Sequence, residues 1–149
     1  LTGLINENVI LAKTNAKKKK ILITTEFADD NKVKVDKNMF SAILRNLLTN
    51  AIKFTKENGK IRVKTSINDD FLLIEVEDNG VGMNEEILNN LFKIEKAHSS
   101  YGTSGEVGTG LGLIICKEFM DKHGGKIWAT SEKSVGSTFY FTFPRSKST

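Results

Sequence analysis

The stretch KNMFSAILRNLLTNAIKFT, residues 37–55, is the strongest helix signal in the chain. Its apolar residues recur at the i, i+3, i+4 and i+7 spacing that lines one face of a helix: Phe40, Ile43, Leu44, Leu47, Leu48, Ala51 and Ile52. Asp36, which precedes the stretch, can cap the helix N-terminus. The pattern predicts an amphipathic helix with one buried face.

A second stripe on this helix is polar. Asn46, Asn50 and Lys53 recur at spacings of four and three residues, so their side chains point the same way. A solvent-exposed face is one interpretation, although two asparagines cost helix stability because asparagine is a mediocre helix former. A magnesium ion bound to a nucleotide takes one or two protein oxygens and completes its octahedron with phosphates and water. An Asn carbonyl and a Lys ammonium on one face fit that demand.

The segments on either side of this helix alternate between helical and strand-like patterns. Helices are predicted at 4–16, 84–91 and 111–122, the last ending at Gly124-Gly125. Strands are predicted at 21–27, 31–36, 61–67, 71–78, 126–132 and 137–144, with 61–67 and 71–78 paired as a hairpin. Residues 92–110 read as a long loop. The fold class predicted is α/β (α+β): a two-layer sandwich of a mixed, mostly antiparallel sheet and about three helices.

Composition indicates one globular domain. The chain has 149 residues, of which 39% are hydrophobic and 27% are charged. Much of its net charge of +4 comes from the run Lys17–Lys20, which predicts a solvated helix end rather than a nucleic-acid site. Cys116 has no cysteine partner and predicts a buried thiol in a reducing compartment. No apolar run approaches the ~20 residues that span a bilayer, so we expect a soluble domain, excised from a longer protein.

A glycine-rich stretch, GEVGTGLGL at 105–113, precedes the last predicted helix. Gly108, Gly110 and Gly112 allow close approach of a ligand to the backbone, and free N–H groups at a helix N-terminus favour a phosphate. The spacing is neither the dinucleotide fingerprint nor a Walker loop. A phosphate loop and a flexible hinge therefore stay open as alternatives.

The stretch DNGVGMN, residues 78–84, has two interpretations. Asp-Asn-Gly is ordinary turn chemistry and needs no ligand. With a phosphate loop and a magnesium face elsewhere in the chain, however, Asp78 becomes a candidate acceptor for the exocyclic amine of adenine. Gly80 and Gly82 would leave room for the base. We prefer this second interpretation.

Five motifs occur in an order typical of one known family: RNLLTNAIKFT (45–55), DNGVGMN (78–84), LFKI (91–94), GTGLGL (108–113) and GSTFYFTFP (136–144). Together they closely resemble the catalytic ATP-binding domain of sensor histidine kinases. The wider superfamily includes gyrase-type topoisomerases, the Hsp90 chaperones and the MutL repair proteins. The resemblance implies a helical connector at 1–20 from a missing dimerisation and phosphoacceptor hairpin, a catalytic domain at 21–145 and a tail at 146–149.

The resemblance also implies a set of site residues. Asn50 becomes the magnesium ligand, Lys53 a phosphate contact and Asp78 the acceptor of the adenine amine. Asn46 lies near the metal and phosphates, and the catalytic residues implied are Asn46, Asn50 and Lys53. Phe92 begins a lid over about 93–108, which we expect to be mobile without nucleotide because it has little to bury. The remaining nucleotide-binding positions are Phe54, Gly80, Gly82, Gly108, Thr109, Gly110, Leu111, Gly112 and Thr138, the last near the adenine water network.

The activity implied is binding of ATP with Mg²⁺ and donation of the γ-phosphoryl group to a histidine on a separate dimerisation domain. The partners implied are ATP, that domain and the receiver domain of a response regulator, with no nucleic acid. The fragment is expected to be monomeric and its parent homodimeric. A cytoplasmic location follows, with membrane anchoring of the parent left open. Neither His98, in the lid, nor His123, at a helix C-terminus, is a suitable acceptor.

Two rival functions belong to other classes. ATPases and ATP-driven clamps of the superfamily carry a glutamate base one turn before the metal asparagine, where this chain has Asn46, and an amide cannot take a proton from water at neutral pH. The other rival is a serine kinase of a regulatory protein, or an ATP-sensing module without transfer. The lid also departs from the family pattern, with Lys93 and Lys96 where many relatives have arginine.

Overall fold

The computed structural model describes residues 2–28, 36–93, 100–101, 107–108 and 112–144. The elements in chain order are α1 (Thr2–Lys18), β1 (Leu22–Glu26), α2 (Lys37–Phe54), β2 (Lys60–Ile67), β3 (Phe71–Asp78), α3 (Glu85–Asn90), β4 (Ser100–Tyr101), β5 (Val107–Gly108), α4 (Gly112–Lys122), β6 (Lys126–Glu132) and β7 (Gly136–Pro144). Most bounds agree with the prediction within one or two residues. The strand predicted at 31–36 falls almost wholly outside the described residues, and β4 and β5 form a short antiparallel pair inside the predicted loop.

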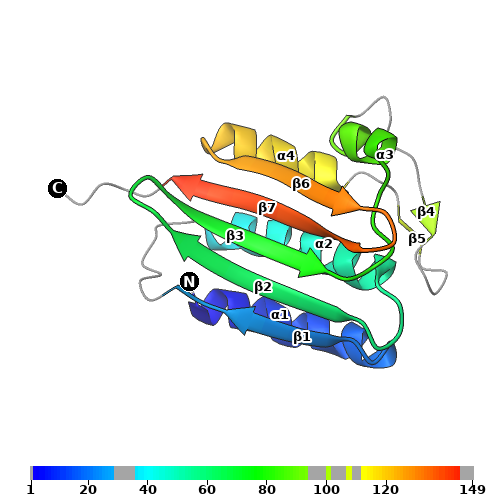
Figure 1. Cartoon of the computed structure of the whole chain (residues 1–149). Helices are drawn as coiled ribbons and strands as arrows, with labels where there is room; N and C mark the ends of the chain where they lie inside the picture. The colour runs from blue at the N-terminus through cyan, green and yellow to red at the C-terminus, as the bar shows by residue number, and fades with distance from the viewer. Residues whose placement is uncertain (1, 29–35, 94–99, 102–106, 109–111, 145–149) are drawn as a thin grey trace.

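Five strands form the main sheet in the order β1-β2-β3-β7-β6. The β1–β2 pair is parallel, and the other pairs are antiparallel. Helices α1, α2 and α4 lie on one face of this sheet, whereas α3 lies beyond the end of β6 (Figure 1). The predicted two-layer sandwich with a mixed, mostly antiparallel sheet is therefore confirmed.

The core lies between the sheet and the helices. The apolar stripe of α2 is buried as predicted, and Asp36 caps the helix by accepting a hydrogen bond from the Met39 amide at 2.9 Å. Phe40 on this stripe contacts Phe141 and Phe143 of β7, with ring centroids 5.6 and 5.5 Å apart. Each buried side chain of this size contributes roughly 1.5–3 kcal/mol to folding.

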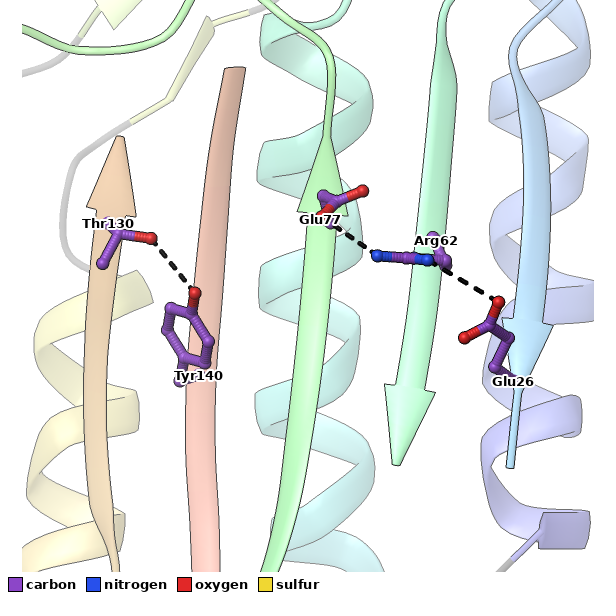
Figure 2. A network of polar contacts seen from close by, with 5 residues as sticks. All are labelled: Glu26, Arg62, Glu77, Thr130 and Tyr140. Carbon is purple, nitrogen blue, oxygen red and sulfur yellow. Dashed lines mark hydrogen bonds and ion pairs between the residues drawn. The ribbon is translucent and has the colours of Figure 1, made fainter. Parts of the chain in front are cut away.

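The other face of the sheet carries polar and aromatic side chains. Figure 2 shows Arg62 of β2 between Glu26 and Glu77, with N–O distances of 3.6 and 3.2 Å. These side chains are substantially exposed, so each ion pair contributes about 0–1 kcal/mol. Tyr140 belongs to the same face. Because neighbouring residues of a strand point to opposite faces, Asp78 points to the helix side when Glu77 points away from it.

Helix α1 is part of the same core. Ile5, Val9 and Ala16 are buried together with the α2 stripe. Leu11, an apolar residue within the predicted helix range, is 64% exposed. The helix also extends beyond the predicted range 4–16 at both ends. Within the part of the chain that the structure describes, no helix is long and apolar enough to cross a lipid bilayer.

The lysine run at the C-terminal end of α1 is not uniformly solvated, which corrects the prediction. Lys17, Lys18 and Lys20 are exposed, but Lys19 is only 5% exposed. Lys20 has a positive φ of 54°, and the Ile21 amide donates to the Ala16 carbonyl at 3.0 Å. This geometry is that of a left-handed helix C-cap. At this turn the Lys19 side chain is buried, whereas those of the neighbouring lysines are exposed.

Candidate functional site

Asp78, the last residue of β3, is a buried carboxylate at the edge of the core. Its Oδ1 accepts hydrogen bonds from the amides of Gly80 at 2.9 Å and Ser137 at 3.3 Å. Among the described residues, none donates to Oδ2. Burial raises the pKa of this carboxyl more strongly than the two backbone hydrogen bonds lower it, and the nearby charge of Glu77 raises it further. Of the two carboxyl oxygens, described residues thus hold Oδ1 and leave Oδ2 to a ligand.

Gly80 lets the loop after β3 approach the C-terminal end of α2. A Cβ added here would overlap the Phe54 carbonyl oxygen and would lie 2.9 Å from Asp78 Oδ1. The next amide, that of Val81, donates to the same Phe54 carbonyl at 3.0 Å. The glycine is therefore explained by backbone packing, in addition to any room it leaves for a base. The contact brings Asp78 next to the end of α2.

Gly82 serves a similar purpose on the other side of the loop. It has a φ of +67°, and an added Cβ would overlap the Glu132 carbonyl of β6. The following amide, that of Met83, donates to Ser131 Oγ at 2.8 Å. The turn interpretation and the ligand interpretation of DNGVGMN are thus compatible, since Asp78 forms the turn with one oxygen only.

The β7 residue that lies opposite Asp78 is Ser137, not Thr138. Ser137 is the register partner of Asp78, and its hydroxyl lies 2.8 Å from Ser131 Oγ. Thr138 is the register partner of Glu77, on the face away from the helices. Neither Ser137 nor Ser131 was predicted as a site residue from the sequence. The alternation of Phe139, Phe141 and Phe143 places Ser137 on the buried face and could have identified it.

The polar stripe of α2 separates into residues with different surroundings. Asn46 Nδ2 donates to the Ala42 carbonyl at 3.0 Å, and Asn46 Oδ1 lies against Gly112, the first residue of α4. Asn50 is half-buried, and no described residue forms a hydrogen bond with its amide. Asn46 is therefore engaged between two helices, whereas Asn50 is the more available amide for a ligand.

Lys53 and Phe54 lie at the C-terminal end of α2. The Lys53 side chain is buried, and its Nζ lies 4.8 Å from the centroid of the Phe54 ring. This arrangement places a cation and an aromatic ring at the helix end that the Asp78 loop also contacts. Asp78, Lys53 and Phe54 are thus brought together by the fold, from segments more than 20 residues apart.

The donor set for a metal is sparse. Among the described residues, no group of three or more His, Cys, Asp or Glu side chains could hold a metal ion by itself. One amide oxygen, that of Asn50, fits a magnesium ion whose other ligands are phosphates and water. The residues present therefore fit Mg²⁺ only as an ion that accompanies a nucleotide.

A depression of about 460 Å³ lies at the ends of β3, β6 and β7. Its lining includes Asp78, Ser137 and Thr138, and its volume is within the range of small-molecule sites. Neither Asn50 nor Lys53 lines it. The depression is therefore only a neighbour of the site outlined by α2 and Asp78.

The lid positions are described only in part. Phe92 packs partly against the core, and Gly108 ends the short strand β5. Thr109, Gly110, Leu111 and most of the expected lid lie outside the described residues. Gly112 begins α4, where an added Cβ would lie 2.5 Å from Asn46 Oδ1. Gly112 thus lies directly against the polar stripe of α2, at Asn46.

Residues 35–147 match the HATPase_c family, described as histidine kinase-, DNA gyrase B- and HSP90-like ATPases. Among curated proteins, the sensor histidine kinase WalK of Bacillus subtilis is 35% identical over 118 residues, which cover 75% of this chain and 19% of WalK. The chain thus spans about a fifth of that relative's length.

Solved structures of the histidine kinase ThkA and of ShkA share the fold. The nucleotide-free catalytic domain of ThkA matches with a TM-score of 0.84 and 32% identity, over 97% of this chain and 94% of that chain. ThkA in complex with the response regulator protein TrrA matches with a TM-score of 0.80 and 29% identity, over 98% of this chain and 40% of that chain. Full-length ShkA in complex with AMPPNP matches with a TM-score of 0.82 and 26% identity, over 98% of this chain and 30% of that chain. The chain therefore belongs to this ATPase family, as a catalytic domain of the sensor histidine kinase type.

Proposed function

We propose that this chain binds Mg²⁺-ATP and donates the γ-phosphoryl group to a histidine on a separate dimerisation domain in two-component signalling. The observation that carries the proposal is the Asp78 carboxylate, which is buried at a strand end and held by the described residues through Oδ1 only. An open carboxylate oxygen accepts a hydrogen bond from the amino group at position 6 of adenine. It repels the carbonyl oxygen that guanine has at that position. AMPPNP, an ATP analogue, is bound in the ShkA structure, which supports the same class of ligand here.

Asn50 and Lys53 would hold the metal-bound phosphates. When bound, Mg²⁺ supplies the charge neutralisation that phosphoryl transfer requires. The Asn50 amide oxygen is suited to the metal because no described residue engages it, and the Lys53 ammonium adds positive charge at the same end of α2. Phe54 offers a ring beside that ammonium. The role of these residues is to bind and orient, since a loose transition state needs positioning more than covalent chemistry.

Asn46 favours a kinase over an ATPase clamp. Hydrolysis needs a general base to take a proton from water, and an amide is not a base at neutral pH. The Asn46 side chain is also already engaged with Ala42 and lies against Gly112. In the proposed reaction the nucleophile is an imidazole nitrogen from another domain, so no base at this position is needed.

The partners proposed lie in the parent protein and beyond it. Residues 1–20 would connect to a dimerisation and phosphoacceptor domain, residues 21–145 would form the catalytic unit, and 146–149 a tail. The parent would be a homodimer with this domain in the cytoplasm, and a response regulator would receive the phosphoryl group afterwards. The complex of ThkA with TrrA supports a partner of that kind. His123 follows the C-terminal end of α4 and is not proposed as acceptor.

Radiolabelling with γ-labelled ATP tests the proposal. We expect calorimetry to detect Mg²⁺-dependent ATP binding, the chain alone to remain unlabelled, and an added phosphoacceptor domain from the same parent to become labelled on histidine. Stable label on His98 or His123, or absence of ATP binding, would contradict the proposal.

The matched variants for this test lie side by side on α2. Asn50→Ala should weaken Mg²⁺-ATP binding by about tenfold or more, the effect of losing one interaction with a charged partner. The fold should survive, because Asn50 lies off the apolar stripe and alanine favours helix. Thr49→Ala, at the exposed neighbouring position, should leave binding unchanged. Equal affinity and equal magnesium dependence in wild type and Asn50→Ala would remove Asn50 from the metal.

A further inference from the structure

We propose that Lys19 is a positioning residue for the nucleotide site, because its buried ammonium holds the C-terminal end of α2. Lys19 Nζ donates to the Ile52 carbonyl at 2.8 Å and to the Lys53 carbonyl at 3.3 Å. These partners lie 33 and 34 residues away in the chain. The inference rests on the proposed function for its effect on ATP, and on the contacts alone for its effect on α2.

The C-terminal end of a helix needs partners for its last carbonyls, because they have no amide one turn ahead. In α2, Lys19 donates to the carbonyls of Ile52 and Lys53, and the Val81 amide donates to that of Phe54 at 3.0 Å. The Ile52 carbonyl also accepts the Thr55 amide at 3.4 Å, a longer contact than the 2.8 Å to Lys19. A cation is also favourable at this end of the helix dipole. Two segments that are distant in sequence therefore meet at the helix end that carries Lys53 and Phe54.

The backbone around Lys19 keeps its side chain in this position. The left-handed turn at Lys20 ends α1, and the Lys19 carbonyl accepts from the Asn58 amide at 3.0 Å, just after α2. Lys19 is thus joined to the α2–β2 connection through its backbone and to α2 through its side chain. A flexible surface lysine would lose side-chain entropy on binding a carbonyl, whereas this one is already ordered by burial.

The consequence reaches the adenine side of the site. The Phe54 carbonyl accepts a hydrogen bond from the Val81 amide, and Gly80 lies against the same carbonyl and Asp78 Oδ1. A shift of the α2 end would therefore move Lys53 and Phe54 directly and disturb the loop that orients Asp78. Lys19 links helix α1 to all three residues without itself touching a ligand.

Lys19→Met tests this role, because methionine keeps the apolar stem and removes the ammonium. Circular dichroism first checks that the wild type and Lys19→Met are both folded. We then expect Lys19→Met to weaken Mg²⁺-ATP binding about tenfold. We also expect it to shift the backbone amide resonances of Lys53, Phe54 and Val81. Lys18→Met, which removes the same charge from an exposed neighbour, should change neither. Lys19→Gln, which keeps an N–H donor on a shorter side chain, should give a smaller loss and replaces Lys19→Met if that variant does not fold.

The two readouts separate this inference from the proposed function. If the wild type failed to bind Mg²⁺-ATP, the proposed function would fall, while the resonance shifts would still decide whether Lys19 positions α2. If the wild type bound ATP and Lys19→Met or Lys19→Gln bound it equally well with unshifted resonances, the inference would be overturned. A lower melting temperature alone, with unchanged affinity and resonances, would assign Lys19 a merely structural role and overturn it equally.

Discussion

Asp78 has different surroundings for its two carboxylate oxygens. Oδ1 accepts the amides of Gly80 and Ser137, as a turn-forming aspartate does, whereas no described residue donates to Oδ2. Burial raises the pKa of this carboxyl, so its charge is held at some cost to the fold. A buried acceptor oxygen to which no described residue donates is typical of a binding site.

We expect Asp78→Asn to weaken ATP binding about ten- to a hundredfold and to reduce the preference for ATP over GTP. The amide oxygen of asparagine can replace Oδ1 as an acceptor, so its NH₂ group would then face the amino group of adenine, donor against donor. Competition of ATP and GTP against a fluorescent ATP analogue measures both effects. Glu75→Gln makes the same charge change on the opposite face of β3 and serves as the control. Equal competition by GTP on the wild type would remove Asp78 from the adenine site.

At the scale of elements, α2 and α4 meet through a small residue and an amide. Gly112 begins α4 beside Asn46 Oδ1, and Asn46 is held in place by its hydrogen bond to the Ala42 carbonyl. The last glycine of GTGLGL therefore permits close helix packing, whatever it also contributes to phosphate binding. This contact sets where α4 starts relative to the polar stripe of α2.

A double-mutant cycle measures that contact. Gly112→Ala should destabilise the domain by about 1–3 kcal/mol, because the new methyl group would overpack against Asn46. In an Asn46→Ala background the same change should be neutral or stabilising, since alanine is a better helix former than glycine. Urea unfolding of the four proteins gives the coupling free energy. An equal effect of Gly112→Ala in both backgrounds would mean that Asn46 is not the obstacle.

At the scale of the whole molecule, Cys116 reports on the folded core. The thiol is 1% exposed on α4, and its burial, as predicted from the sequence, raises its pKa from 9.0 to about 11 against a smaller opposing effect of Asn46. In that pH interval the folded state keeps a proton that the unfolded chain loses. Stability therefore falls as the pH rises, by at most about 1.4 kcal/mol per pH unit.

Cys116→Ala isolates this contribution from that of other titrating groups. The difference in free energy of unfolding between wild type and variant should be constant near neutral pH, where both states hold the thiol proton. It should shrink as the pH rises above 9.0, because only the wild type loses stability through Cys116. Urea unfolding across the alkaline range provides the measurement. A difference that stays constant up to pH 11 would show that the thiol is not shielded by the fold.

Residue spacing alone determined the main helices and strands, the buried stripe of α2 and the stretch that contains Asp78. These features depend on local periodicity, which states which residues share a face. Alternation along β7 likewise places Ser137, and not the predicted Thr138, on the face of Asp78. The local part of the candidate site was thus available from the sequence.

Tertiary structure alone decided which distant groups meet. Four consecutive lysines are equivalent in sequence, yet only Lys19 is buried, because its acceptors are carbonyls of α2 more than 30 residues away. Gly80 is required by the Phe54 carbonyl, which no spacing within DNGVGMN indicates. The placement of β7 between β3 and β6 likewise brings Ser137 beside Asp78 across 59 residues. Local patterns specify faces, whereas the pairing of faces depends on long-range packing and on satisfying backbone groups that no neighbour in sequence can reach.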